Sequence, residues 1–155
     1  PLPRPPPTST LHGSSAASVV YKRQAHNFGG IRAIVNSVSN IYHDLIIVYG
    51  CGGERDSSER GKIMKFTCAN SRKVIFTSDN CRNESFQSIL DDSRKDQEYS
   101  NLIVEPDRKQ AIKNGIDALK EDEILLILGK GHEEYQEIKG TKIPFNDQRV
   151  VEEIL

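Results

Sequence analysis

Four short apolar runs recur along the chain and limit the folds open to it. Each is rich in β-branched or aliphatic residues, and each is followed by polar residues. Continuous apolar runs of this length are typical of strands that are buried on both faces of a parallel sheet. We predict that one sheet contains the runs at 44–49 (DLIIVY), 73–77 (KVIFT), 101–104 (NLIV) and 123–128 (EILLIL).

Segments with helical spacing separate these runs. The clearest is residues 106–122, where Pro106 suits the first turn and an apolar stripe is made by Ala111, Ile112, Ile116 and Leu119. Strands that alternate with helices predict βαβ units and a mostly parallel sheet. Further helices are predicted within residues 27–42, 61–70, 84–92 and 147–155.

Residues 135–145 (YQEIKGTKIPF) depart from this alternation. Gly140 supplies a turn between two short runs, which predicts a hairpin or an edge pair. Asn146 or Asp147 would cap the helix that follows. The predicted fold is an α/β, Rossmann-like three-layer sandwich, with a mostly parallel sheet, an antiparallel edge and helices on both faces.

The composition excludes several classes of function. The 155 residues suit one domain, and a formal net charge of −1 creates no field that favours nucleic acid or an anionic membrane. No apolar run approaches the roughly 20 residues of a membrane helix. Cys51, Cys68 and Cys81 have no paired metal spacing and suit a reducing cytoplasm better than a disulfide framework. We expect a cytoplasmic protein without nucleic-acid or membrane partners.

Residues 1–18 differ from the rest of the chain. They are rich in Pro and Ser, contain no acidic residue and show no hydrophobic period. Such a segment cannot bury enough surface to offset its ordering entropy, so we expect it to lack regular structure. Because the chain does not begin with Met, we also expect a piece of a longer or processed protein.

Polar loops follow all four predicted strands, at residues 50–56, 78–82, 105–108 and 129–134. Ligands of open parallel sheets bind beyond the carboxyl ends of the strands, so the loops predict a site at that edge. Arg55 and Arg82 could each hold a carboxylate through two hydrogen bonds, and Asp79 and Glu133 could hold an ammonium group. Together they suit a zwitterion, and the alternative is that they form surface ion pairs.

Common cofactor motifs are absent from the sequence. The GK pair at 61–62 is followed by Ile63, and Asp56 stands at the first glycine position, so there is no GxxxxGK[ST] phosphate loop for ATP. The HEEYQ segment has Gln136 where a zinc-binding HExxH motif has its second histidine. Glycines in residues 50–53 could cradle an anion or form a flexible connection. We assign no metal ligand and no catalytic residue.

Four segments together resemble the C-terminal domain of the Mur ligase family. They are VYGCGGERD, TSDNCR, VEPDRKQAI and GKGHEEYQEIKGTKIPFNDQRVV, in the order and spacing of that family. The likeness is greatest to members that add meso-diaminopimelate to UDP-N-acetylmuramoyl-L-alanyl-D-glutamate. It implies a Mur ligase C-terminal, amino-acid-binding domain at residues 25–155, preceded by a disordered or foreign tail at 1–24.

The resemblance also implies a binding site for meso-diaminopimelate. The two arginines would grip the distal carboxylate end of this diamino acid, and lysine-adding relatives lack the arginine of the second loop. Where the family reads Asp-Asn-Pro-Arg, Cys81 replaces the proline, so we expect a less rigid loop. The residues implied to bind the substrate are Arg55, Asp79, Asn80, Arg82, Gly129 and Glu133.

The same resemblance places the remaining chemistry outside this chain. The family opens the domain with Asp-Tyr-Ala-His-Thr-Pro, whose residues face the nucleotide. Here only Ala25 and His26 match, and Arg23 stands at the aspartate position. An N-terminal domain for the UDP-sugar and a central domain for ATP and Mg²⁺ do not fit in 155 residues. The resemblance therefore implies an ATP-dependent acid–amino-acid ligase whose C-terminal domain is inactive alone.

Two other interpretations stay open from the sequence. One is a stand-alone module that binds a diamino acid or a small anion. The other is a decayed remnant of the ligase that keeps the fold without the site. The ligase domain predicts an upstream coding region with a GKT-type phosphate loop, the module predicts ligand binding without it, and the remnant predicts neither.

Overall fold

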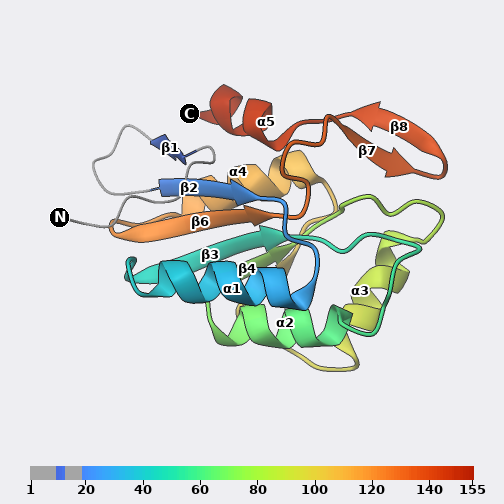
Figure 1. The fold of residues 1–155 in the computed structure, drawn as a ribbon, viewed down its shortest axis with the longest axis horizontal. Coiled ribbons are helices and arrows are strands. Elements are labelled where there is room, and N and C mark those ends of the chain that lie inside the picture. The colour runs from blue at the N-terminus through green and yellow to red at the C-terminus, as the bar shows by residue number, and fades with distance from the viewer. Residues whose placement is uncertain (1–9, 13–18) are drawn as a thin grey trace.

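The structure, a computed structural model, describes residues 10–12 and 19–155. Its centre is a six-stranded sheet with the strand order β1-β2-β6-β3-β4-β5 (Figure 1). The strands from β2 to β6 run parallel, and β1 pairs antiparallel with β2 at one edge. The strands are β1 (Thr10–His12), β2 (Val19–Arg23), β3 (Asp44–Tyr49), β4 (Lys73–Phe76), β5 (Leu102–Val104) and β6 (Glu123–Leu128).

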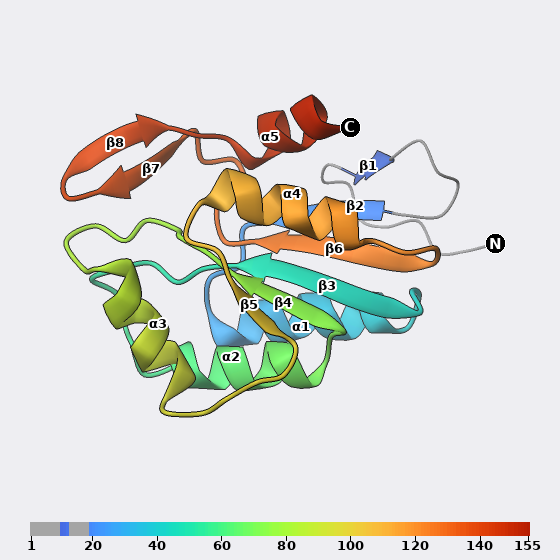
Figure 2. The ribbon, with the colours of Figure 1, turned by 180° about the vertical axis from the view of Figure 1, so that it is seen from behind.

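Helices cover both faces of this sheet (Figures 1 and 2). One face carries α1 (Phe28–Ser39), α2 (Arg60–Ala69) and α3 (Phe86–Arg94), and the other carries α4 (Arg108–Ala118) and α5 (Asp147–Ile154). The predicted three-layer α/β sandwich is therefore confirmed. Within the part of the chain that the structure describes, no helix is long and apolar enough to cross a membrane.

Two apolar clusters, one on each face of the sheet, explain the continuous apolar runs. Along β3, Leu45, Ile47 and Tyr49 lie in the cluster shared with α1, α2 and α3, whereas Ile46 and Val48 lie in the cluster shared with α4 and α5. Successive residues of a strand face opposite sides, so a strand that is buried on both faces must be apolar throughout. All four predicted strands lie in this one sheet, as expected.

Polar side chains fix the starts of the helices on the second face. Asp107 accepts a hydrogen bond from the backbone N–H of Gln110 at 3.2 Å, and Asn146 accepts one from Arg149 at 3.0 Å. Both are therefore N-caps, and Asn146 is one of the two caps that were predicted. The prediction for Pro106 is wrong, because this residue precedes the cap of α4 and lies outside its first turn.

The sheet extends further towards the N-terminus than predicted. β2 pairs with β6 from Val19–Ile124 to Arg23–Leu128, although its apolar run was too short to indicate a strand. The prediction that residues 1–18 lack regular structure is wrong for β1, because pairing with β2 stabilises it. Residues 1–9 and 13–18 lie outside the described residues. The foreign origin of residues 1–24 and the domain boundary at 25 stay predictions.

A hairpin follows the last parallel strand. It consists of β7 (Tyr135–Ile138) and β8 (Thr141–Pro144), with Gly140 at a φ of 75° in the turn, as predicted. The hairpin forms its own two-stranded sheet, so the antiparallel edge of the large sheet is β1 instead. An isolated bridge between Arg82 and Ile138 joins the hairpin to the loop after β4.

Candidate functional site

A cleft lies where the loops after β3, β4 and β6 meet, beyond the carboxyl ends of these parallel strands. The loop before α1 closes a further side of it. This is where open α/β sheets bind ligands. All of the residues predicted to form a site line this cleft, namely His26, Arg55, Asp79, Asn80, Arg82, Gly129 and Glu133.

Close contact between loops, rather than a phosphate cradle, explains the glycines after β3. A Cβ added to Gly50 would lie 2.2 Å from the Thr77 carbonyl oxygen, and one added to Gly53 would lie 1.9 Å from the Cys81 carbonyl oxygen. The Gly53 N–H also donates to the Asn80 carbonyl at 2.8 Å. Glycine at these positions therefore lets the first loop lie against the second.

Asn80 links the loop after β4 to both of its neighbours. Its side-chain oxygen accepts from Lys130 Nζ at 2.8 Å and from the backbone N–H of Glu137 at 2.9 Å. Because both of these partners can only donate, the amide nitrogen must point the other way, and it donates to Glu133 Oε2 at 2.9 Å. Asn80 therefore holds the carboxylate of Glu133 at the edge of the cleft.

Lys130 is the centre of the acidic side of the site, and sequence reasoning missed it. Its side chain is completely buried, and Nζ lies 3.2 Å from Asp79 Oδ1, 3.4 Å from Glu133 Oε2 and 2.9 Å from the Tyr135 carbonyl oxygen. One cation therefore serves two carboxylates, which leaves a formal charge of −1 beside the cleft. Within the described residues Glu133 Oε1 has no hydrogen-bond partner, so it is available to a ligand.

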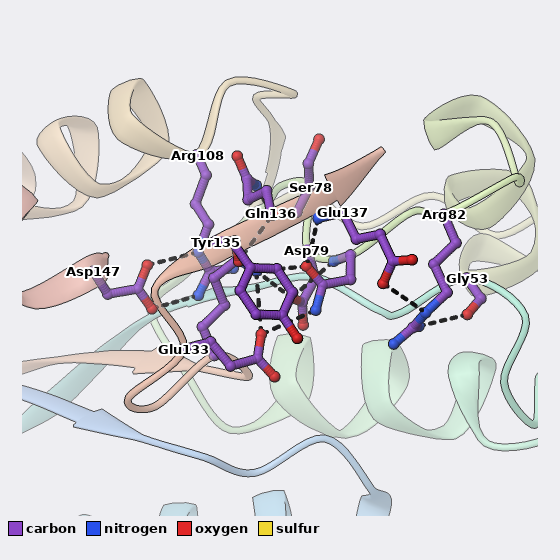
Figure 3. Close-up of polar contacts among 12 residues, drawn as sticks. Gly53, Ser78, Asp79, Arg82, Arg108, Glu133, Tyr135, Gln136, Glu137 and Asp147 are labelled. Atoms are coloured by element: carbon purple, nitrogen blue, oxygen red, sulfur yellow. Dashed lines mark hydrogen bonds and ion pairs between the residues drawn. The ribbon is translucent and has the colours of Figure 1, made fainter. Parts of the chain in front are cut away.

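Arg82 and Arg55 form the basic side of the site. Arg82 Nη1 donates to the Gly53 carbonyl at 2.8 Å, and Arg82 Nε lies 3.6 Å from Glu137 Oε2 (Figure 3). Arg55 is exposed and makes no hydrogen bond or ion pair within the described part of the chain. A Cβ on Gly52 would lie 3.2 Å from Arg82 Nη1 and 3.4 Å from Arg55 Cδ, so the two arginines meet above this glycine.

Arg60, which the sequence did not single out, supports the loop that carries Arg55. Its buried guanidinium pairs with Glu84 at 2.8 Å and Asp92 at 3.2 Å, and it donates to the Gly52 carbonyl at 2.9 Å. The hydrogen bond from Arg60 lowers the pKa of the Glu84 carboxyl. These contacts tie the loop after β3 to α3 and to the loop that precedes α3. They depend on the burial of Arg60, which the sequence does not show.

The loop after β5 serves the helix rather than the cleft. Arg108, which follows this loop as the first residue of α4, is buried and forms a bidentate pair with Asp147, with both distances at 2.8 Å (Figure 3). The same guanidinium donates to the Ser78 carbonyl at 3.3 Å and to the Leu128 carbonyl at 3.2 Å. Arg108 therefore fixes the ends of β4 and β6, from which the site loops begin.

The three cysteines are free, and none is prepared for chemistry. Burial raises the pKa of the Cys51 thiol, in the wall of the cleft, to about 12 and that of Cys68 to about 11. Burial also raises the pKa of Cys81. Thiols with such pKa values stay protonated at neutral pH and are poor nucleophiles. Among the described residues, no group of three or more His, Cys, Asp and Glu side chains could hold a metal ion.

The parallel sheet and the charge-paired cleft at its carboxyl edge define an α/β domain with a site for a small polar ligand. Residues 10–131 match the family described as "Mur ligase, glutamate ligase domain". The chain therefore belongs to the Mur ligase C-terminal domain family, as the resemblance implied.

Individual relatives share one printed name, UDP-N-acetylmuramoyl-L-alanyl-D-glutamate--2,6-diaminopimelate ligase. The protein from Aquifex aeolicus is 48% identical over 116 residues, which cover 72% of this chain and 23% of that protein. The protein from Clostridium perfringens is 38% identical over 132 residues, covering 84% of this chain and 27% of the relative. The chain thus spans about a quarter of the length of the curated relatives that it matches.

Solved structures agree with this assignment. A structure of a ligase with the same name superposes with a TM-score of 0.87 at 28% identity, over 96% of this chain and 31% of that one. Folylpolyglutamate synthase from Thermotoga maritima superposes with a TM-score of 0.53 at 21% identity, over 76% of this chain and 26% of the synthase. This second likeness concerns the fold alone.

Proposed function

We propose that the chain is the amino-acid-binding domain of a ligase that adds meso-diaminopimelate to UDP-N-acetylmuramoyl-L-alanyl-D-glutamate in peptidoglycan synthesis. One observation carries the proposal: Arg55 and Arg82 lie on one side of the cleft, and Asp79 and Glu133, which share the Lys130 cation, lie on the other. The printed name of the relatives supports the identity of the substrates.

The charges of the cleft suit the distal end of diaminopimelate, which carries both a carboxylate and an ammonium group. The carboxylate would accept from the Nη1–Nη2 edge of Arg82, where Nη2 is unbonded within the described residues, and from Arg55. The ammonium group would donate to Glu133 Oε1, beside Asp79 and Gly129. Lysine presents only the ammonium group at this end, so it would offer the two arginines no carboxylate.

The rest of the reaction belongs to parts of the relatives that this chain does not span. There, an N-terminal domain would hold the UDP-sugar, and ATP and Mg²⁺ in a central domain would supply activation of the acceptor carboxylate. The role of this chain is to bind the diamino acid and orient its proximal amine. His26, exposed at the rim of the cleft, is the residue we assign to the side that faces the nucleotide.

Arg82→Ala in a ligase that carries this domain is expected to reduce the preference for diaminopimelate over lysine. A charge-assisted bidentate pair contributes about 1.5–3 kcal/mol. Since 1.4 kcal/mol is a factor of ten, the ratio of kcat/KM values for the two amino acids should fall by about ten- to hundredfold. The matched control is Arg149→Ala, which removes an exposed arginine that pairs with Glu134 on another surface. An unchanged ratio would show that Arg82 does not select the substrate.

The 155-residue chain alone is expected neither to hydrolyse ATP nor to form an amide bond. The physical reason is that phosphoryl transfer depends on a phosphate loop and a metal site, and the sequence has no GxxxxGK[ST] motif. Release of phosphate from ATP by the purified chain is the measurement. Turnover above a buffer control, and absent from a Lys130→Met preparation, would contradict the expectation.

A stand-alone module for a diamino acid is the second candidate. The observation that favours it is that both charged pairs proposed to hold the ligand, Arg55 with Arg82 and Asp79 with Glu133, come from this one domain. Such a module would bind diaminopimelate without any ligase domain in the same protein. The coding sequence upstream of the codon for Ala25 distinguishes the two, because only a ligase requires a phosphate loop there.

A further inference from the structure

Glu137, in the first strand of the hairpin, contacts the loop that carries Asn80 and Arg82 at three points. Its backbone N–H donates to Asn80 Oδ1 at 2.9 Å, and its carbonyl accepts from the Arg82 N–H at 2.9 Å. Its carboxylate faces the Arg82 guanidinium (Figure 3). The next residue but one, Lys139, donates its N–H to the Arg82 carbonyl at 2.7 Å. Strand β7 and the turn that follows it thus hold the backbone of Arg82 from both sides.

This support matters because Arg82 has an unfavourable backbone conformation. Its φ is 52°, in the left-handed region that a side chain with a Cβ seldom adopts. The hydrogen bonds to Glu137 and Lys139 compensate for this conformation. They also fix the direction in which the Arg82 side chain leaves the loop, which is across Gly52 and into the cleft.

Two oxygens then restrain the guanidinium itself. The Gly53 carbonyl accepts from Nη1, and Glu137 Oε2 lies 3.6 Å from Nε. Nη2 has no hydrogen-bond partner within the described residues. Arg82 lines the cleft, whereas Glu137 is not among its lining residues. The carboxylate therefore approaches Arg82 from outside the cleft, where it leaves Nη2 open to a ligand.

We propose that Glu137 is a positioning residue for Arg82, and through it a determinant of specificity for a ligand with a second carboxylate. The proposal rests on the proposed function for the identity of that ligand. Without Glu137 the long Arg82 side chain would sample several rotamers, and binding would have to order it again. A ligand such as lysine, which lacks the second carboxylate, does not need this arrangement and would be indifferent to it.

Glu137→Gln in the 155-residue chain separates the side-chain charge from the backbone contacts. The substitution keeps both backbone hydrogen bonds of residue 137, so the loop and hairpin remain joined. NMR first records the Nε–H signal of Arg82 without ligand. Titrations with meso-diaminopimelate and with lysine, followed by the same method, then give the two dissociation constants. We expect motional averaging of the Nε–H signal, and a dissociation constant for diaminopimelate that rises about three- to fivefold, as for a partly exposed ion pair. The constant for lysine should not change.

Glu134→Gln is the matched control, because Glu134 precedes the same strand but pairs with Arg149 at 3.7 Å. It should leave the Arg82 signal and both titrations unchanged. The inference is overturned if Arg82 stays equally ordered in Glu137→Gln, or if the affinities for diaminopimelate and lysine fall together. If the unmodified chain binds neither amino acid, the proposed function fails for this chain. The Arg82 signal in the absence of ligand still decides whether Glu137 positions it.

Discussion

Arg108→Ala is expected to lower the free energy of unfolding by about 3–5 kcal/mol, the loss typical of breaking a buried ion pair. Arg108 and Asp147 are 0% and 1% exposed, and two hydrogen bonds of 2.8 Å join them. Removing the guanidinium leaves the Asp147 carboxylate buried without a counter-charge. Two backbone carbonyls, of Ser78 and Leu128, lose a donor as well.

The pair with Asp147 also affects the pKa of Arg108. Burial lowers the pKa of the guanidinium, but the charge and hydrogen bonds of Asp147 outweigh the burial, so the pKa is raised above its usual value. The group therefore stays charged at neutral pH. The destabilisation by Arg108→Ala should accordingly be the same at pH 6 and pH 8.

Urea denaturation monitored by circular dichroism measures this loss. Lys109→Ala is the control on the same helix, since Lys109 and Glu153 form a pair in which both side chains are 60% exposed. Such surface pairs contribute about 0–1 kcal/mol. The double variant Arg108→Met, Asp147→Leu should be more stable than Arg108→Ala, because it removes both charges. A loss below about 1 kcal/mol for Arg108→Ala would show that the pair does not hold the helices and loops together.

Lys130→Met is expected to have an effect of similar size, also about 3–5 kcal/mol. Methionine fills the space of the lysine stem but cannot donate. Asp79 and Glu133 would then face each other without the cation that they share, and Asn80 Oδ1 and the Tyr135 carbonyl would lose a donor. A loss of this size is a large fraction of the 5–15 kcal/mol that is typical of a domain, roughly a fifth or more.

The same denaturation experiment tests Lys130, with Lys142→Met as the control. Lys142 lies in β8 of the hairpin, where its Nζ is 4.6 Å from the centre of the Tyr135 ring. It carries the same charge on an exposed residue, so its replacement should cost about 1 kcal/mol or less. Equal losses of unfolding free energy for the two variants would show that the buried charge network stabilises the domain no more than an exposed lysine does.

The position of the site was predictable from the sequence, because it follows from the order of the strands. Parallel strands that alternate with helices place all of their carboxyl ends at one edge, so the loops after 44–49, 73–77 and 123–128 had to meet there. The bounds of β3 and β6 matched the prediction because strands buried on both faces are apolar throughout. The residues that the family resemblance named in these loops all line the cleft, and their role in binding stays a prediction.

Tertiary structure alone decided which charged residues support the cleft from behind. Arg82 and Arg108 both follow strands and look alike in sequence, yet Arg82 opens to the cleft and Arg108 is buried against Asp147, 39 residues away. Lys130 meets Asn80 across 50 residues, and Glu137 meets Asn80 across 57. The addition of β2 to the sheet was equally hidden, because it depends on pairing with β6. Burial and ion pairing depend on segments far apart in the chain, so local sequence patterns carry no record of them.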